Sequence, residues 1–102
     1  MIIKSIKVIR PNTETDFYDF SLEFVSHRLE NYINTGMLSI GTVMSDDGLS
    51  KTSTFIFSNQ TAKNKYSLDP IVVEELRRKN IYNNSNGITT ISNSISTYQE
   101  VA

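Results

Sequence analysis

Few side chains in this sequence could carry out chemistry, and the single imidazole is the first to consider. His27 has Glu23 four residues before it and Glu30 three residues after it, a spacing that brings side chains together on one helix face. A zinc site needs several Cys, His or carboxylate ligands at suitable spacing, and the sequence has no cysteine. We therefore expect a plain surface histidine, no bound metal or other cofactor and no thiolate chemistry.

A basic run in the last third of the chain could bind phosphate. Arg77–Lys79 places three cations in a row on a predicted helix. Glu74 precedes Arg78 by four residues and Glu75 precedes Lys79 by four, which is the spacing of stabilising ion pairs on a helix surface. We interpret the run as a solvated, locally neutralised helix face.

Two phenylalanines alternate along the segment KTSTFIFS and invite comparison with RNA-recognition domains, whose third strand stacks aromatic rings on bases. Only Lys51, Phe55 and Ile56 match that motif, and the first expected strand, IIKSIKVI, has no aromatic residue. The net charge of −1 also argues against nucleic-acid binding, which relies on a positive field around the protein. We expect Phe55 and Phe57 to form a dimer core or the wall of a pocket.

The elements that would position these residues follow from periodicity and from turn signals. The sequence predicts a strand ended by Pro11, then a helix from a capping box at Thr13 to Gly36. A hairpin of strands 37–44 and 51–57 is predicted around Asp46-Asp47-Gly48, where aspartate favours a turn more than a cation site.

The second half of the chain predicts one more helix and one more strand. Segment 59–68 is polar and is expected to hold one loose helical turn. Asp69 and Pro70 begin a helix that Gly87 ends, and residues 88–98 form a mixed strand suited to a sheet edge. The order β-α-β-β-α-β predicts a single α+β domain over residues 1–102. Its fold would be ferredoxin-like, a four-stranded antiparallel sheet with both helices on one face.

Two features of this prediction call for a partner. On the first helix, one apolar stripe is expected to face the core, and a second stripe of three phenylalanines needs another partner, inside or outside the chain. The first stripe consists of Tyr18, Leu22, Val25, Leu29, Tyr32 and Ile33, and the second of Phe17, Phe20 and Phe24. The first three strands carry apolar residues on both faces, so a monomer would leave an apolar sheet face in water. We expect a homodimer through that face.

The segment DPIVVEELRRKNIYNNSNGI, residues 69–88, carries the most specific resemblance. A DP helix start, a charged helix and YNxxNGI before the last strand resemble small members of the dimeric α+β barrel superfamily, which includes antibiotic-biosynthesis monooxygenase-like proteins. The resemblance covers the whole chain in the order and length of its elements. It implies two ferredoxin-like subunits whose sheets close face to face and, for an enzyme, monooxygenase-like chemistry without a metal cofactor. The haem-degrading members use an Asn, a His and a Trp, and because this chain has no Trp their catalytic residues are not carried over.

The function hypotheses follow from these observations. Abundant Asn, Ser, Ile and Thr indicate AT-rich coding, as in a phage or mobile element, and the absence of a long apolar run or signal-peptide core predicts a cytoplasmic protein, in the host cytoplasm if phage-encoded. The leading hypothesis is a non-enzymatic, dimeric accessory or interaction protein of unknown process, because each reactive residue has a structural explanation.

The alternative is a cofactor-independent enzyme or binder of a small aromatic or hydrophobic molecule, held between helix and sheet and walled in part by Met37 or Met44. Its candidate ligand-binding residues are His27, Phe55, Phe57, Tyr82 and Asn83. Tyr82 and Asn83 come first, because the end of the helix requires neither of them.

Overall fold

In the computed structural model, which describes residues 1–97, four strands form one antiparallel sheet in the order β2-β3-β1-β4. The strands are β1 (Ile2–Ile9), β2 (Leu38–Met44), β3 (Ser50–Phe57) and β4 (Thr89–Thr97). The predicted position of the last strand at a sheet edge is confirmed, while Tyr98, the final residue of that prediction, lies outside the described residues. The prediction of an α+β chain with a four-stranded antiparallel sheet is confirmed.

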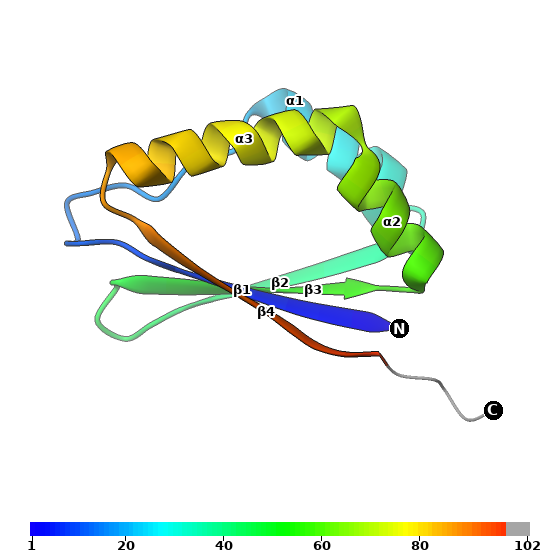
Figure 1. Cartoon of the computed structure of the whole chain (residues 1–102), viewed down its shortest axis with the longest axis horizontal. Helices are drawn as coiled ribbons and strands as arrows, with labels where there is room; N and C mark the ends of the chain where they lie inside the picture. Colours follow the sequence, from blue (N-terminus) through cyan, green and yellow to red (C-terminus); the bar gives the residue numbers. More distant parts are fainter. Residues whose placement is uncertain (98–102) are drawn as a thin grey trace.

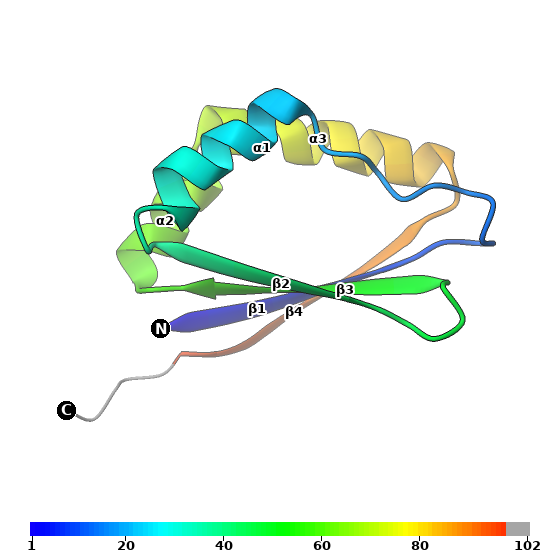
Figure 2. The same ribbon diagram turned by 180° about the vertical axis from the view of Figure 1, so that it is seen from behind.

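Three helices lie together on one face of this sheet and leave the other face bare (Figures 1 and 2). They are α1 (Leu22–Arg28), which continues as a π-helical turn η1 (Leu29–Ile33), then α2 (Gln60–Leu68) and α3 (Pro70–Ser85). α3 is the longest and runs along the sheet, whereas α1 and α2 are short.

The predicted bounds of α3 are confirmed. The Asp69 carboxylate accepts a hydrogen bond from the backbone N–H of Ile71 at 2.9 Å, and Pro70 occupies the first helical position. At the other end Gly87 has a φ of 68°, a left-handed conformation in which side chains with a Cβ are strained.

The predicted first helix is wrong in its start, and the predicted single turn at 59–68 is too short. Asn12 accepts hydrogen bonds from the N–H groups of Glu14 and Thr15, so a turn forms where a helix was expected. α1 begins only after Ser21, whose hydroxyl accepts from the Phe24 N–H at 3.3 Å. Residues 60–68 form the complete helix α2, because Asn59 caps it through the Ala62 N–H at 2.8 Å.

The hairpin and its turn are confirmed. β2 pairs with β3 from Leu38↔Phe57 to Met44↔Lys51, and Gly48 takes a φ of 72° in the turn. Asp47 accepts hydrogen bonds from the Ser45 hydroxyl at 2.6 Å and from the Leu49 N–H at 3.0 Å, so it acts as the predicted turn residue.

The core lies between the helices and the sheet and is built mainly on aromatic rings. Tyr32 meets Tyr66 edge-on at 5.0 Å between ring centroids, and Phe57 lies 5.6 Å from Tyr66. The predicted core stripe of the first helix is confirmed for Tyr32 and wrong for Leu22, which is 81% exposed, whereas Phe24 from the second stripe is buried. Aromatic rings bury more surface than Leu or Val, and their packing sets the rotation of α1.

The bare face of the sheet is mixed in character. Because side chains alternate along each strand, the positions between those that face the helices point to this side. They include Ile3, Ile9, Val43, Ile56 and Ile91, set among Ser5, Lys7, Ser39, Thr52 and Thr54. Phe55 and Phe57 point to the helix side, so the bare face presents neither of these rings for stacking on bases.

Candidate ligand-binding site

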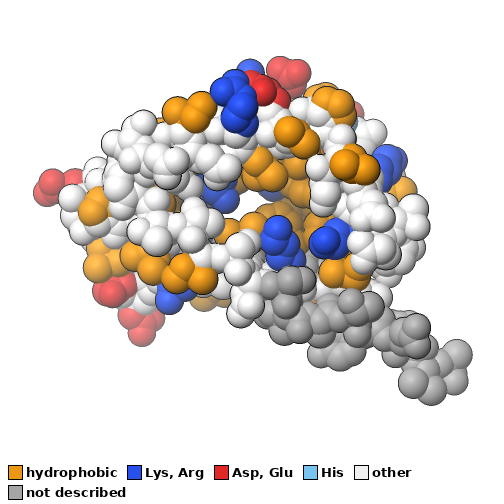
Figure 3. Space-filling view, viewed as in Figure 1, with side chains coloured by type: hydrophobic (Ala, Val, Ile, Leu, Met, Phe, Trp, Pro, Cys, Tyr) orange, Lys and Arg blue, Asp and Glu red, His pale blue; other side chains and the backbone are white. Residues whose placement is uncertain are grey.

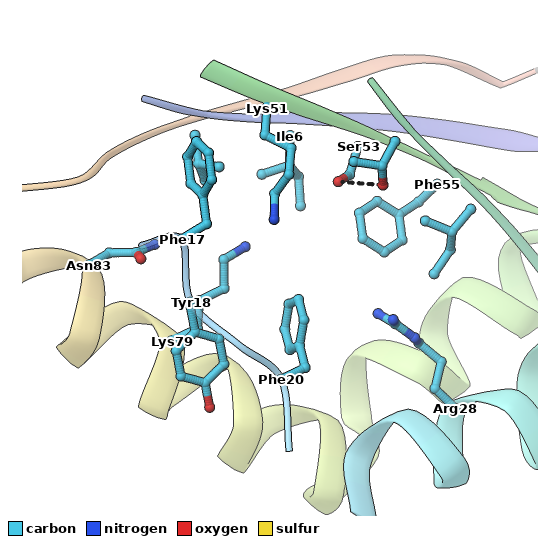
Figure 4. Close-up of a pocket in the computed structure, with 13 residues that line it drawn as sticks. Ile6, Phe17, Tyr18, Phe20, Arg28, Lys51, Ser53, Phe55, Lys79 and Asn83 are labelled. Carbon is cyan, nitrogen blue, oxygen red and sulfur yellow. Dashed lines mark hydrogen bonds between the residues drawn. The ribbon is translucent and has the colours of Figure 1, made fainter. Parts of the chain in front are cut away.

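A cavity of about 210 Å³ lies between the helix layer and the sheet. A hollow opens there in the space-filling view, with apolar and basic side chains around it (Figure 3). Figure 4 shows the cavity from close by, and its lining residues come from β1, the loop before α1, α1, β2, β3 and α3: Ile6, Val8, Phe17, Tyr18, Phe20, Arg28, Ile40, Thr42, Lys51, Ser53, Phe55, Lys79 and Asn83. An apolar cavity of roughly 150 Å³ holds a benzene molecule, so this space has the size for a one-ring ligand.

The aromatic wall comes mainly from the loop that replaces the expected start of the first helix. Tyr18 and Phe20 meet edge-on at 5.3 Å between centroids, and Phe20 stacks on Phe24 at 5.3 Å. Extended backbone before Ser21 is what lets Phe17 and Phe20 reach the cavity from one side while Phe55 reaches it from the sheet.

Two side chains fasten this loop to the rest of the protein. Arg10 donates to the Gly48 carbonyl at 2.8 Å and to the Thr15 carbonyl at 3.1 Å, so it joins the loop to the hairpin turn. Tyr82 on α3 donates its hydroxyl to the Asp16 carbonyl at 2.7 Å. The loop is thus fastened to the hairpin turn of the sheet on one side and to α3 on the other.

Three cations enter the cavity from both layers. Lys51 reaches in from the sheet, and Arg28 and Lys79 reach in from the helices (Figure 4). Burial lowers the pKa of the Lys79 ammonium, and the nearby charges of Lys51, Arg28 and Lys4 lower it further. Burial also lowers the pKa of Lys51, helped by Arg10 and opposed by Asp19.

No carboxylate lines this cavity in the described part of the chain. The ion pairs between described residues involve His27, Arg77 and Arg78 as cations, so Arg28, Lys51 and Lys79 have no carboxylate within 4 Å there. They contact rings instead: the Arg28 guanidinium lies 5.4 Å from the Phe20 centroid, and the Lys51 ammonium lies 4.8 Å from that of Phe17.

Asn83 adds a buried amide to the lining. It is 3% exposed, and its side-chain nitrogen makes one long hydrogen bond of 3.4 Å to the Thr90 hydroxyl. Its side-chain oxygen accepts no hydrogen bond from residues 1–97. Buried polar atoms are normally paired, so this carboxamide is available to a ligand.

The structure separates the five residues singled out from the sequence. Phe55 and Asn83 line the cavity. Phe57 is buried in the core, and Tyr82 lies behind the aromatic wall with its hydroxyl on Asp16. His27 lies at the α1–α3 contact instead, and neither Met37 nor Met44 lines the cavity.

His27 belongs to a closed hydrogen-bond cluster, so the prediction of a plain surface histidine is wrong. Its Nε2 lies 2.6 Å from the Asp69 carboxylate, and its Nδ1 lies 3.2 Å from the Asn31 amide. Tyr32 donates its hydroxyl to the same Asp69 oxygen at 2.7 Å. Burial raises the pKa of Tyr32, and the hydrogen bond to Asp69 raises it further. Both ring nitrogens of His27 are occupied, which fits a role in joining helices.

Glu75 and Lys79 do not form the surface pair that the sequence predicted. Glu75 is 2% exposed and accepts hydrogen bonds from the Ser21 N–H at 2.7 Å and from the Ser21 hydroxyl at 3.2 Å. Glu74 makes the predicted pair with Arg78 at 3.4 Å and a closer one with Arg77 at 2.6 Å. Lys79 is therefore left facing the cavity.

Strand and helix periodicity in the sequence also places the basic residues of the lining. Lys51 lies four residues before Phe55, so alternation places both on the same face of β3. Val72, Glu75, Lys79 and Asn83 follow the spacing of one helix face, so the same periodicity turns all four toward the sheet.

Other classes of site have little support in the described chain. Residues 1–97 contain no group of three His, Cys, Asp or Glu side chains that could hold a metal ion. No helix in that range has the length and apolar character needed to cross a membrane. Comparison with protein families, curated proteins and solved structures found no significant match to this chain.

Proposed function

We propose that this chain is a ferredoxin-like binding protein that takes up a small aromatic molecule between its helices and its sheet. The observation that carries the proposal is the aromatic-walled cavity of about 210 Å³ with a buried amide in its lining. Ligand sites are typically concave and mostly apolar, with a few polar groups that orient the ligand. The strand order β2-β3-β1-β4 with the helices on one face supports the ferredoxin-like assignment.

The composition of the lining supports binding more than acid–base catalysis. The side chains most often used to move protons are imidazole and carboxylate. Neither lines the cavity in the part of the chain that the structure describes. The His27–Asp69–Tyr32 cluster lies at the contact between α1 and α3, and its polar atoms satisfy one another.

Filling the cavity tests this proposal. Ser53 lines the cavity from β3, and its hydroxyl lies 3.2 Å from that of Thr42. We expect Ser53→Leu to abolish binding of one-ring aromatic compounds, because the added side chain occupies the ligand volume, while the melting temperature stays the same or rises. Calorimetric titration of a panel of one-ring aromatic acids and amides measures the binding.

The matched control places the same side chain on the opposite face of the same strand. Thr54 points to the bare face, so Thr54→Leu should leave binding intact. Equal binding by Ser53→Leu and wild type would contradict the proposed location, and an absence of binding by wild type to the whole panel would contradict the function.

A second proposal concerns assembly: two copies associate through their bare sheet faces, as the resemblance to dimeric α+β barrels implies. Val43 is 72% exposed and Ile91 50% exposed on that face, with Ile3, Ile9 and Ile56 beside them. Covering these side chains would remove apolar surface from water.

Sedimentation equilibrium tests this assembly. We expect a dimer of the 11.6-kDa chain at micromolar concentration, and we expect Val43→Lys to make it a monomer by burying an unpaired charge. Val73→Lys is the matched control, because Val73 is 50% exposed on α3, away from the bare face. A wild-type monomer at that concentration would contradict the proposal.

A further inference from the structure

We infer that the ligand of this cavity is an anion, specifically a one-ring aromatic acid whose carboxylate meets Lys51, Lys79 and Arg28. The inference rests on the proposed function, because it names the class of molecule that the same cavity would take. It goes beyond that function in making charge the main determinant of selectivity.

The charge of the lining favours an anionic ligand. Three cations point into one small space, and no carboxylate of the described chain lines it with them. A fourth, Lys4, is close enough to Lys79 to influence its charge. Like charges in a partly desolvated space repel one another strongly, because the effective dielectric constant there is lower than in water. A bound anion would remove that repulsion, whereas a neutral ligand would leave it in place.

Lys79 differs from the other basic residues of α3 in having no carboxylate within 4 Å among the described residues. Arg77 and Arg78, two positions and one position before Lys79, both pair with Glu74 within 4 Å. Glu75, the carboxylate four residues before Lys79, is instead held by Ser21. α3 thus neutralises its surface cations and leaves Lys79 unneutralised at the cavity.

The lining has an apolar part that fits the ring of such a ligand and a basic part that fits its carboxylate. Phe20 and Phe55 offer flat apolar surfaces to a ring. Arg28 presents a guanidinium that matches the geometry of a carboxylate, and lysines add charge-assisted hydrogen bonds. The buried carboxamide of Asn83 can donate to or accept from a polar ring substituent.

The test compares benzoate with benzamide, which have nearly the same shape and differ in charge. By isothermal titration at neutral pH we expect wild type to bind benzoate at least about tenfold more tightly than benzamide. Lys79→Met should lose this preference and bind the two compounds equally, and its unliganded melting temperature should rise by about 3 °C, because a buried like charge is gone. Lys65→Met, which removes an exposed cation on α2, should keep the preference.

The outcomes separate the two proposals. Equal binding of benzoate and benzamide by wild type would overturn the inference about charge and leave the aromatic cavity standing. Binding of neither compound would overturn both. Retention of the full preference by Lys79→Met and also by a second variant, Lys51→Met, would overturn the assignment of these cations to the ligand.

Discussion

Replacing Asp69 with alanine is expected to lower the free energy of unfolding by about 3 kcal/mol. One carboxylate oxygen caps α3 through the Ile71 N–H, and the other accepts from the buried Tyr32 hydroxyl and from His27. Alanine would remove the cap and leave the Tyr32 hydroxyl buried without its closest acceptor. Urea unfolding followed by circular dichroism measures the change.

Asp46→Ala is the control for this substitution. Asp46 is exposed in the hairpin turn, so its loss should change the unfolding free energy by less than about 0.5 kcal/mol. If Asp69→Ala were as mild as Asp46→Ala, the hydrogen-bond cluster would not hold α1 against α3 as described.

The lowered pKa of the Asp69 carboxyl predicts how the free energy of unfolding changes at acidic pH. Burial opposes ionisation of this carboxyl, but hydrogen bonds from His27 and Tyr32 outweigh burial and hold its pKa below the ordinary 3.8. A carboxyl with a lower pKa in the folded state contributes stability above the unfolded value and loses it as the pH falls through the folded value. Wild type should therefore lose this contribution below about pH 3.8, and Asp69→Asn should show a shallower loss in the same range.

Glu75→Ala is the second large effect, with an expected loss of about 3 kcal/mol. The carboxylate is almost fully buried and accepts from both the backbone N–H and the hydroxyl of Ser21. Alanine would leave the Ser21 N–H unsatisfied and a void between α3 and the loop before α1. By the usual size scaling this corresponds to a fall of roughly 15 °C in melting temperature, measurable by differential scanning calorimetry.

The neighbouring residue gives a matched control. Glu74 has the same side chain one position earlier and pairs with Arg77 and Arg78 at the surface. Exposed ion pairs contribute little, so Glu74→Ala should cost less than about 1 kcal/mol. Similar losses for the two variants would contradict a stabilising role for the hydrogen bonds between Glu75 and Ser21.

Both carboxylates also determine the shape of the cavity. Asp69 and Glu75 fasten the two ends of α1 to the first half of α3, and the loop that carries Phe17 and Phe20 runs directly into α1. A short helix has little intrinsic stability, so these contacts must hold it in place. The aromatic wall of the cavity therefore depends on hydrogen bonds made at its edge.

The sequence was most informative where local chemistry decides the structure. Asp69-Pro70 and Gly87 bound α3 as predicted, because an N-cap, a proline at the first position and a left-handed glycine each act within a few residues. The hairpin was predictable for the same reason: Asp47 and Gly48 satisfy the requirements of the turn by themselves.

Predictions from the sequence were wrong for the start of the first helix and for the length of α2. Thr13 and Asp16 match a capping box, yet Asn12 forms a local turn through the Glu14 and Thr15 N–H groups, and Tyr82, 66 residues away, binds the Asp16 carbonyl. Asn59 could have predicted α2, because an Asn before a polar segment is a good N-cap.

The basic part of the candidate site was not predicted, because an ion-pair spacing that holds on most helix surfaces does not hold here. The spacing of Glu75 and Lys79 predicts an exposed ion pair, but Ser21, 54 residues away in sequence, captures Glu75 and leaves Lys79 facing the cavity. No local pattern reveals a partner at that separation. Asn83 was noticed because the helix end did not explain it, and it lines the cavity.

The central claim is that the space between the helices and the sheet binds an aromatic acid, and a two-dimensional ¹H–¹⁵N NMR titration with benzoate tests it most directly. The account predicts saturable shifts of backbone amides around Phe17–Phe20 in the loop, Lys51–Phe55 on β3 and Lys79–Asn83 on α3. An absence of shifts, or shifts confined to exposed residues such as Leu22 and Leu68, would contradict it.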